Sequence, residues 1–375
     1  MSKCNIIKNG IHVDVQGNID YCCEMTVDGV ERPTFTDYDS FKSHALTVYE
    51  QSKTEWPSGC SGCQYREETD GTFSLRKEGN MITKYTDESD TSIWHAIINT
   101  ANVCNLACRM CGQGPSSRWG HYIKHHSPAI LAKQFTGSGA SVHMHNDHTT
   151  AIVNEHVVNP NLRKLVLSGG EPTQSYRAMD LVQQLMDQGY SKNVKLQVIT
   201  NASIPWKDTW ADVLKYFGKI NITVSMDGTH DNYNYIRHEA DFDTTVSIAE
   251  HLKDRCYEHG DADFGIAYCW QAANAHKFLY DQQWFEDRFP NFMYTTVHSP
   301  DYVTVDCIPT PLMEKYGIRE LYGKEYRPEG FRKFMAAMRW MDRMFGKLGE
   351  LENQNPDLFD YLDGREIYYE GKLWF

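Results

Sequence analysis

The sequence predicts an α/β protein built on a parallel β-sheet. From residue 93 onward, short β-rich apolar runs alternate with segments of helical periodicity. Six such runs, joined by helical crossovers, favour parallel pairing, either in an α/β barrel or in an open sheet. In both arrangements the residues that carry chemistry are expected at the carboxyl ends of the strands.

Each element of this prediction has a defined place in the chain. Strands are expected at 93–103, 165–168, 194–200, 220–226, 263–268 and 292–297. Helices are expected at about 115–135, 174–188, 207–217, 242–258 and 276–288. After Pro300 the alternation ends, and 330–351 is expected to be a helix with a packing stripe at Phe334, Met338, Met341 and Phe345. The apolar segment 367–375 is expected to pack or pair.

Length, charge and cysteine content limit the class of protein. The 375 residues allow one large domain plus a small one, and the net charge of −13 argues against a broad electrostatic grip on nucleic acid. The first residues lack the apolar core of a signal peptide, and no run has membrane-spanning length, which predicts a cytoplasmic protein. In that compartment, eleven cysteines indicate metal ligands or free thiols rather than disulfides.

Residues 1–70 are predicted to form a small cysteine-rich unit. Segment 11–23 alternates apolar and polar residues around Gly17, as in a hairpin, and 36–53 is expected to be a helix. Four cysteines of this unit can supply a closed set of thiolates for zinc or for a four-iron cluster: Cys4, Cys22 or Cys23, Cys60 and Cys63. The polar segment 71–92 is expected to be a connector to the main domain, 93–300, which 301–375 follows as a helical extension.

A CxxxCxxC motif at Cys104, Cys108 and Cys111 follows the first strand of the main domain. A loop leaving a strand can bring three thiolates around one point, and three thiolates leave a bound metal with one open position. The plainer alternatives are three unrelated cysteines, or a zinc site whose fourth ligand lies elsewhere.

Polar residues follow three further strands at the same expected edge. They are Gly169, Gly170 and Glu171, then Asn201, then Ser225 with Asp227. Glycines let a ligand approach the backbone, a carboxylate can accept from an ammonium group, and a hydroxyl beside a carboxylate suits ribose hydroxyls. A polar strand end is usually only a turn or a helix cap, so the repetition at one edge carries the prediction.

The stretch 127–159 is irregular and contains four histidines, His143, His145, His148 and His156. Histidine is a common metal ligand, but polar segments of this kind are more often surface loops. We expect a lid or a substrate-contacting insertion rather than a metal site.

Taken together, these motifs resemble the radical S-adenosylmethionine (AdoMet) enzymes. The matching positions are Cys104, Cys108 and Cys111, Gly169 to Glu171, Thr200 with Asn201, and Ser225 to Gly228 with Arg237 following. The resemblance covers about residues 93–300 and implies a partial (β/α)6 TIM-like barrel. Met110 departs from the pattern, because many members carry an aromatic residue there.

The resemblance implies a [4Fe-4S] cluster on the three motif cysteines, with one iron open to AdoMet. Glu171 would hold the amino group of AdoMet, while Asn201, Ser225 and Asp227 would orient its ribose. Gly169, Gly170 and Arg237 are further expected cofactor-binding positions. Reductive cleavage of AdoMet would give a 5′-deoxyadenosyl radical that abstracts hydrogen from a substrate, with flavodoxin or ferredoxin as a typical reductant.

The N-terminal unit resembles the twitch domain, a shortened SPASM domain. The similar features are an opening cysteine, the spacing from Gly17 to Cys22, a Trp-Pro pair and a CxxC. This resemblance makes Cys22 the ligand beside Cys4, Cys60 and Cys63, and it favours a second, auxiliary [4Fe-4S] cluster over zinc.

Twitch and SPASM relatives often modify peptides or proteins, so a peptide or protein substrate is expected. A small molecule such as a sugar, nucleotide or amino acid is the enzymatic alternative. A non-catalytic iron–sulfur or zinc protein is the alternative from another class. Cys269, at the end of the fifth strand, is a weak candidate for quenching a substrate radical, with a buried structural role more expected.

Overall fold

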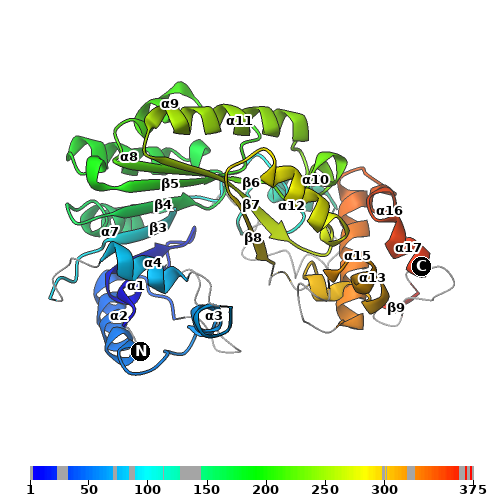
Figure 1. The fold of residues 1–375 in the computed structure, drawn as a ribbon, viewed down its shortest axis with the longest axis horizontal. Coiled ribbons are helices and arrows are strands. Elements are labelled where there is room, and N and C mark those ends of the chain that lie inside the picture. The colour runs from blue at the N-terminus through cyan, green and yellow to red at the C-terminus, as the bar shows by residue number, and fades with distance from the viewer. Residues whose placement is uncertain are drawn as a thin grey trace.

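An eight-stranded sheet in the order β2-β1-β3-β4-β5-β6-β7-β8 organises the fold in the computed structural model (Figure 1). The structure describes residues 3–22, 33–70, 74–83, 89–112, 114–126, 145–297, 300, 302–318, 326–362, 368–369 and 372–373. The predicted α/β class with a mainly parallel sheet is confirmed.

Six consecutive parallel strands form most of the sheet. They are β3 (His95–Asn99), β4 (Lys164–Ser168), β5 (Lys195–Thr200), β6 (Lys219–Ser225), β7 (Ala262–Trp270) and β8 (Phe292–Thr296). Each lies within or overlaps a strand expected from the sequence. Since all six run in the same direction, their carboxyl ends share one edge of the sheet.

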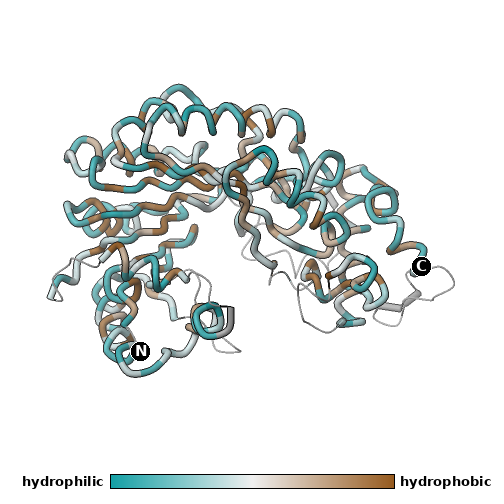
Figure 2. Tube along the Cα trace, viewed as in Figure 1, coloured by the Kyte–Doolittle hydropathy of each residue, from teal (hydrophilic) through white to brown (hydrophobic). Residues whose placement is uncertain are grey.

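Helices cover the sheet through apolar stripes. The crossover helices are α7 (Asp147–His156), α8 (Tyr176–Asp187), α9 (Asp208–Leu214), α10 (His230–Ile236), α11 (Phe242–His259) and α12 (Phe278–Glu286). Figure 1 shows α8, α9 and α11 along one face of the sheet. Helix α8 buries Ala178, Leu181, Val182 and Leu185, the i, i+3, i+4, i+7 pattern of a core-facing helix. Figure 2 shows the matching apolar colour along the central strands.

The N-terminal hairpin is part of the same sheet. Strand β1 (Gly10–Val13) pairs in parallel with β3 and antiparallel with β2 (Ile19–Asp20). Gly17, with φ +89°, makes the turn between them, as the sequence predicts. The cysteine-rich unit is therefore continuous with the main sheet rather than separated from it by a linker, although the predicted domain boundaries themselves stay predictions.

The expected connector 71–92 contains a helix that the sequence analysis did not predict. Helix α4 (Leu75–Ile82) starts at the N-cap Ser74 and packs beside α1 (Asn5–Asn9). At Gly79 an added Cβ would lie 2.3 Å from the Ile6 side chain, so the two helices touch closely. The polar composition of the segment hid this contact. Helices α2 (Tyr38–Ser52) and α3 (Ser61–Tyr65) complete the N-terminal layer.

Part of the histidine-rich stretch is helical, which the sequence analysis did not expect. Residues 127–144, including His143, lie outside the described residues, but α7 occupies 147–156 with Asn146 as its N-cap. His145 Nε2 lies 2.8 Å from the Asp14 carbonyl oxygen, and His156 stacks on Tyr38 at 3.4 Å. His148 Nε2 lies 3.2 Å from the Thr36 carbonyl oxygen, so each of the three described histidines contacts a neighbouring segment, and none of them belongs to a metal-binding group among the described residues.

The C-terminal part is helical, as expected, but it is broken into short pieces. It contains α13 (Thr310–Lys315), α15 (Pro328–Met344), α16 (Glu350–Gln354) and α17 (Pro356–Leu362), followed by the antiparallel pair β9 (Tyr368–Tyr369) and β10 (Lys372–Leu373). The helix expected over 330–351 ends at Met344, because Gly346 and Gly349 turn the chain with φ of +68° and +81°. Within the described part of the chain, no helix has the length and apolar character to cross a membrane.

Candidate functional site

The cysteine loop 104–111 leaves the carboxyl end of β3 and is fixed by its backbone. The amide of Ala107 donates to the His238 carbonyl at 3.2 Å, and the amide of Arg109 donates to the Ile236 carbonyl at 2.9 Å. Residues 106–109 are buried. Hydrogen bonds to the end of α10 and the residues after it therefore fix the backbone of the motif.

The three motif cysteines lie in one loop, and backbone and amide donors point at the sulfur of Cys104. Cys104 lies near Cys108, and the Cys108 and Cys111 thiols are hydrogen-bonded to each other. Burial raises the pKa of Cys104 to about 12, and the hydrogen bond to Cys111 together with burial raises the pKa of Cys108 well above its usual range. The Cys104 sulfur accepts from the Leu106 amide at 3.5 Å and from Asn201 Nδ2 at 3.7 Å. Such donors stabilise cluster-bound thiolates, so the donor set fits an iron–sulfur cluster.

The glycine turn after β4 packs against the segment that leads into the cysteine loop. The Gly170 amide donates to the Ala101 carbonyl at 2.9 Å, and the Glu171 amide donates to the Val103 carbonyl at 2.6 Å. An added Cβ would lie 2.8 Å from the Ala101 oxygen at Gly169, and 2.3 Å from the Val103 oxygen at Gly170. The sequence suggested that these glycines admit a ligand, whereas in the structure they admit the protein's own backbone.

Glu171 ties the ends of two strands together. Its Oε1 accepts from the hydroxyl of Thr173 at 2.7 Å and from that of Thr200 at 2.9 Å, and its Oε2 accepts from the Asn201 amide at 2.8 Å. Burial raises the pKa of this carboxyl although these hydrogen bonds lower it. The side chain is only 2% exposed, so it is already placed and oriented before any ligand binds.

A network of amides joins these turns to the motif. Asn105 Oδ1 accepts from Asn201 Nδ2 at 3.1 Å and from Gln174 Nε2 at 2.8 Å. Asn105 Nδ2 donates to the Ser203 hydroxyl at 2.7 Å. The sequence analysis singled out Asn201 but missed Asn105 and Gln174. Their position inside the motif and directly after the Gly-Gly-Glu turn was the signal that could have identified them.

Asp227 and Arg237 form a buried ion pair beside the motif. Arg237 Nη2 lies 2.7 Å from Asp227 Oδ2, and the Asp227 side chain is fully buried. Asp227 Oδ1 accepts from the Cys269 amide at 2.8 Å. Both charges act on Cys108, where the guanidinium lowers the pKa and the carboxylate raises it. The carboxylate thus faces protein groups rather than open space, and of the three residues expected at the ribose only Ser225 is half-exposed.

Cys269 lies where the sequence placed it, at the carboxyl end of β7. It is half-buried, in contrast to the fully buried Cys256 and Cys307. Its thiol is hydrogen-bonded to Asp227, and burial raises the thiol's pKa. Its carbonyl accepts from Asn274 Nδ2 at 2.9 Å. The thiol is therefore protonated at neutral pH and close to the motif.

A second polar chain that the sequence analysis did not foresee links the hairpin to the sheet. His12 Nδ1 lies 2.9 Å from Asp20 Oδ2, and His12 Nε2 lies 3.2 Å from Asn99 Nδ2. The Ser168 hydroxyl donates to Asn99 Oδ1, and Asp20 Oδ1 accepts from the Cys22 amide at 3.0 Å. Hydrogen bonds thus run from a predicted auxiliary ligand to the last residue of β4.

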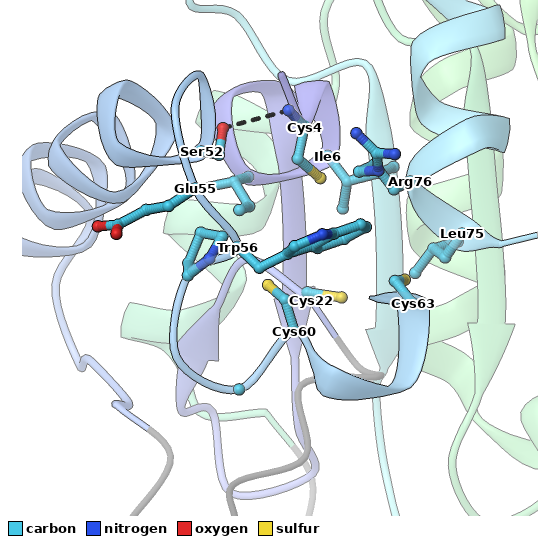
Figure 3. Close-up of a pocket in the computed structure, with 13 residues that line it drawn as sticks. Cys4, Ile6, Cys22, Ser52, Glu55, Trp56, Cys60, Cys63, Leu75 and Arg76 are labelled. Atoms are coloured by element: carbon cyan, nitrogen blue, oxygen red, sulfur yellow. Dashed lines mark hydrogen bonds between the residues drawn. The ribbon is translucent and has the colours of Figure 1, made fainter. Parts of the chain in front are cut away.

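The N-terminal cysteines line one pocket (Figure 3). Cys4, Cys22, Cys60 and Cys63 all contribute to its wall. In Figure 3 the indole of Trp56 crosses the middle of the pocket, between Cys4 and the pair Cys22 and Cys60. The donor set fits a four-thiolate group, and a group held by all four cysteines would displace this indole.

A cation stands at this pocket as well. The Arg76 guanidinium lies 4.4 Å from the centre of the Trp56 ring and is ion-paired with Glu67. Burial raises the pKa of Cys60 to about 11, and Arg76 opposes this rise. The predicted choice of Cys22 over Cys23 stays a prediction, because Cys23 lies outside the described residues.

No three histidine, cysteine, aspartate or glutamate side chains of the described segments are spaced to hold a single metal ion.

Residues 98–260 match the family described as the radical SAM superfamily. A comparison with curated proteins gave no match.

Several solved structures are similar to the chain. Native anSMEcpe with bound AdoMet has 18% identity and a TM-score of 0.40, over 67% of this chain and 62% of that one. SuiB of Streptococcus suis bound to precursor peptide SuiA has 12% identity and a TM-score of 0.34, over 81% and 68%. The radical AdoMet methyltransferase TsrM of Kitasatospora setae, with cobalamin and a [4Fe-4S] cluster bound, has 12% identity and a TM-score of 0.37, over 55% and 34%. The chain thus spans less than two thirds of the length of anSMEcpe.

Proposed function

We propose that the protein is a radical AdoMet enzyme that acts on a peptide or protein. The observation that carries the proposal is the loop with Cys104, Cys108 and Cys111 inside the segment that matches the radical SAM superfamily, with amide donors on the Cys104 sulfur, at the edge where β4 to β7 also end. When bound there, a [4Fe-4S] cluster and AdoMet supply a 5′-deoxyadenosyl radical able to remove hydrogen from a C–H bond.

The protein's own residues position these groups. Asn201 and the Leu106 amide donate to the Cys104 sulfur and stabilise its thiolate form. Glu171 offers a fixed carboxylate for an amino group, since its Oε2 accepts a hydrogen bond from the Asn201 amide and retains acceptor capacity. Ser225 offers a hydroxyl to the ribose.

Asp227 and Arg237 have a revised role in this proposal. Because each neutralises the other, Asp227 acts on the cofactor through Arg237 rather than by direct contact with ribose. The positioning of a reactive radical against one C–H bond and the exclusion of water are the remaining tasks of the site. Gly169 and Gly170 contribute by letting the turn pack on the strand before the motif.

The four N-terminal cysteines are proposed to hold an auxiliary [4Fe-4S] cluster. The support is that all four line one pocket and that the hydrogen-bonded chain through Asp20 and His12 connects it with the sheet. The resemblance to twitch domains favours a peptide or protein substrate. A low-potential donor such as flavodoxin or ferredoxin is the proposed reductant, in a cytoplasmic setting.

Anaerobic reconstitution with iron and sulfide, followed by reduction in the presence of AdoMet, tests the proposal. About eight irons per chain and formation of 5′-deoxyadenosine are the expected results. About four irons with 5′-deoxyadenosine would remove the auxiliary cluster but keep the reaction. Bound zinc with no cleavage of AdoMet would contradict the proposed function as a whole.

A further inference from the structure

The C-terminal part of the chain reaches into the cysteine motif through a buried ion pair. Arg109 stands between Cys108 and Cys111, and its Nη2 lies 2.7 Å from Oδ1 of Asp342 on α15. The two side chains are 1% and 3% exposed. Burying two charges is costly unless their geometry is well defined, so this contact requires both partners to be held in place.

Both partners are indeed held by other groups. Arg109 Nε donates to the Tyr235 carbonyl at 2.7 Å, and its guanidinium carbon lies 3.8 Å from the centre of the Tyr235 ring. The Phe345 ring lies on the same guanidinium at 5.1 Å. Asp342 Oδ2 accepts from the Leu351 amide at 3.0 Å. Neither charge can turn away without losing these contacts.

Further contacts fix the backbone of the motif. The Trp119 indole N–H donates to the Cys108 carbonyl at 3.0 Å, and the Trp119 ring packs on Phe345 at 5.5 Å. The Tyr302 hydroxyl donates to the Arg109 carbonyl at 3.4 Å. Side chains from the C-terminal part therefore contact the Arg109 guanidinium, the Arg109 carbonyl and the Trp119 ring.

We propose that Tyr302, Asp342 and Phe345 of the C-terminal part brace the cysteine loop, and that Asp342 is a positioning residue that fixes Arg109 and neutralises its charge next to the motif. The effect of Asp342 on a bound cluster rests on the proposed function, whereas the bracing of the loop does not. An arginine stays protonated under all practical conditions, so removing the Asp342 charge leaves an uncompensated cation there. Added positive charge stabilises the more negative, reduced form of a cluster.

The first test uses the iron-free protein and hydrogen exchange of the segment 104–112. In Asp342→Asn, we expect the Arg109 amide, which donates to Ile236, to exchange about tenfold faster or more. Asp306→Asn is the matched control, because Asp306 pairs with Arg327 at 2.9 Å in the same C-terminal part. Its exchange in the segment 104–112 should equal that of the wild type. Unchanged exchange in Asp342→Asn would overturn the brace, whether or not the protein binds iron.

The second test measures the midpoint potential of the reconstituted motif cluster in a Cys60→Ala/Cys63→Ala background. Asp342→Asn should raise the potential, and the double variant Arg109→Gln/Asp342→Asn should return it toward the wild-type value, because no net charge remains. An unchanged potential in Asp342→Asn would overturn the electrostatic part of the proposal. If Asp342→Asn fails to fold, the neutral double variant Arg109→Gln/Asp342→Asn still tests the brace. The brace predicts that amides of segment 104–112 exchange faster in this double variant than in Asp306→Asn.

Absence of any cluster in the wild type would instead contradict the proposed function. The exchange experiment would still decide the brace in that case, so the two failures are distinguishable.

Discussion

Arg237 Nη2 lies 2.7 Å from Asp227 Oδ2 in an ion pair that is almost completely shielded from solvent. The pair joins the end of β6 to the end of α10, directly before the segment that holds the cysteine loop. Its charges also reach Cys108. One ion pair thus holds β6 and α10 together at the carboxyl edge of the sheet and also affects the pKa of the Cys108 thiol.

Removal of one partner of this pair should be strongly destabilising. In Arg237→Gln the Asp227 carboxylate loses its counter-charge in a buried position, and we expect the free energy of unfolding to fall by about 3–5 kcal/mol. Urea denaturation of the iron-free protein measures this loss. Arg118→Gln, which breaks the more exposed pair with Glu239, should cost about 0–1 kcal/mol. Equal losses in the two variants would refute the distinction between the pairs.

The glycine turn makes a steric prediction. In Gly170→Ala the new Cβ would lie 2.3 Å from the Val103 oxygen, and because the obstacle is backbone we expect a loss of at least about 2 kcal/mol and weaker iron binding. Gly114→Ala is the control, since no described atom lies within 4 Å of its new Cβ. Thermal unfolding and iron content of both variants check this, and normal iron binding by Gly170→Ala would disprove it.

The sequence predicted the parallel strands well because each is a short apolar run closed by a polar residue. It failed where local composition and tertiary contact disagree. Helix α4 lies in a polar segment, and its contact with Ile6 at Gly79 comes from a residue far away in the chain. The pairing of β1 with β3 could not be predicted either, because the residues of a strand do not specify which distant strand pairs with it in parallel.

Asp281 should make the stability of the fold depend on pH. It is fully buried, and burial raises its pKa from 3.8 to about 6 although Thr229 and Tyr268 donate to it. A raised pKa means that the folded state binds the proton more tightly than the unfolded state does. Its contribution to stability is therefore complete below about pH 4 and is lost as the pH rises through about 6.

Asp281→Asn removes this titration, and the comparison isolates it. Relative to the variant, the wild type should lose about 3 kcal/mol of unfolding free energy between pH 4 and pH 7. Urea denaturation at several pH values measures both proteins. A difference that does not change with pH would show that the carboxyl group keeps its ordinary pKa.

The N-terminal pocket predicts a separable metal site. Cys60→Ala/Cys63→Ala should lower the iron content from about eight to about four per chain, while 5′-deoxyadenosine is still formed. Metal analysis of the purified variants distinguishes this from a zinc site, for which the substitution would remove zinc and leave the iron content unchanged. Loss of all iron would mean that the two cysteine sets do not bind independently.

The sequence was enough to predict which residues lie at the candidate site, but not which groups those residues contact. The motif cysteines, Glu171 and Asn201 follow strands in the sequence, and the parallel sheet brings them to one edge. The sequence could not reveal that Asp227 faces Arg237, because the ion pair depends on how α10 returns to the sheet. The contact between Arg109 and Asp342 was equally hidden, since 233 positions of sequence separate the two charges (342 − 109).

Formation of 5′-deoxyadenosine by Cys108→Ala, compared with the wild type and with Cys256→Ala, tests the central claim most directly. Cys256 is also buried but lies on α11, away from the motif. The account predicts 5′-deoxyadenosine from the wild type and from Cys256→Ala, and none above background from Cys108→Ala. Equal formation by Cys108→Ala and the wild type would contradict the assignment of the motif cysteines to AdoMet cleavage.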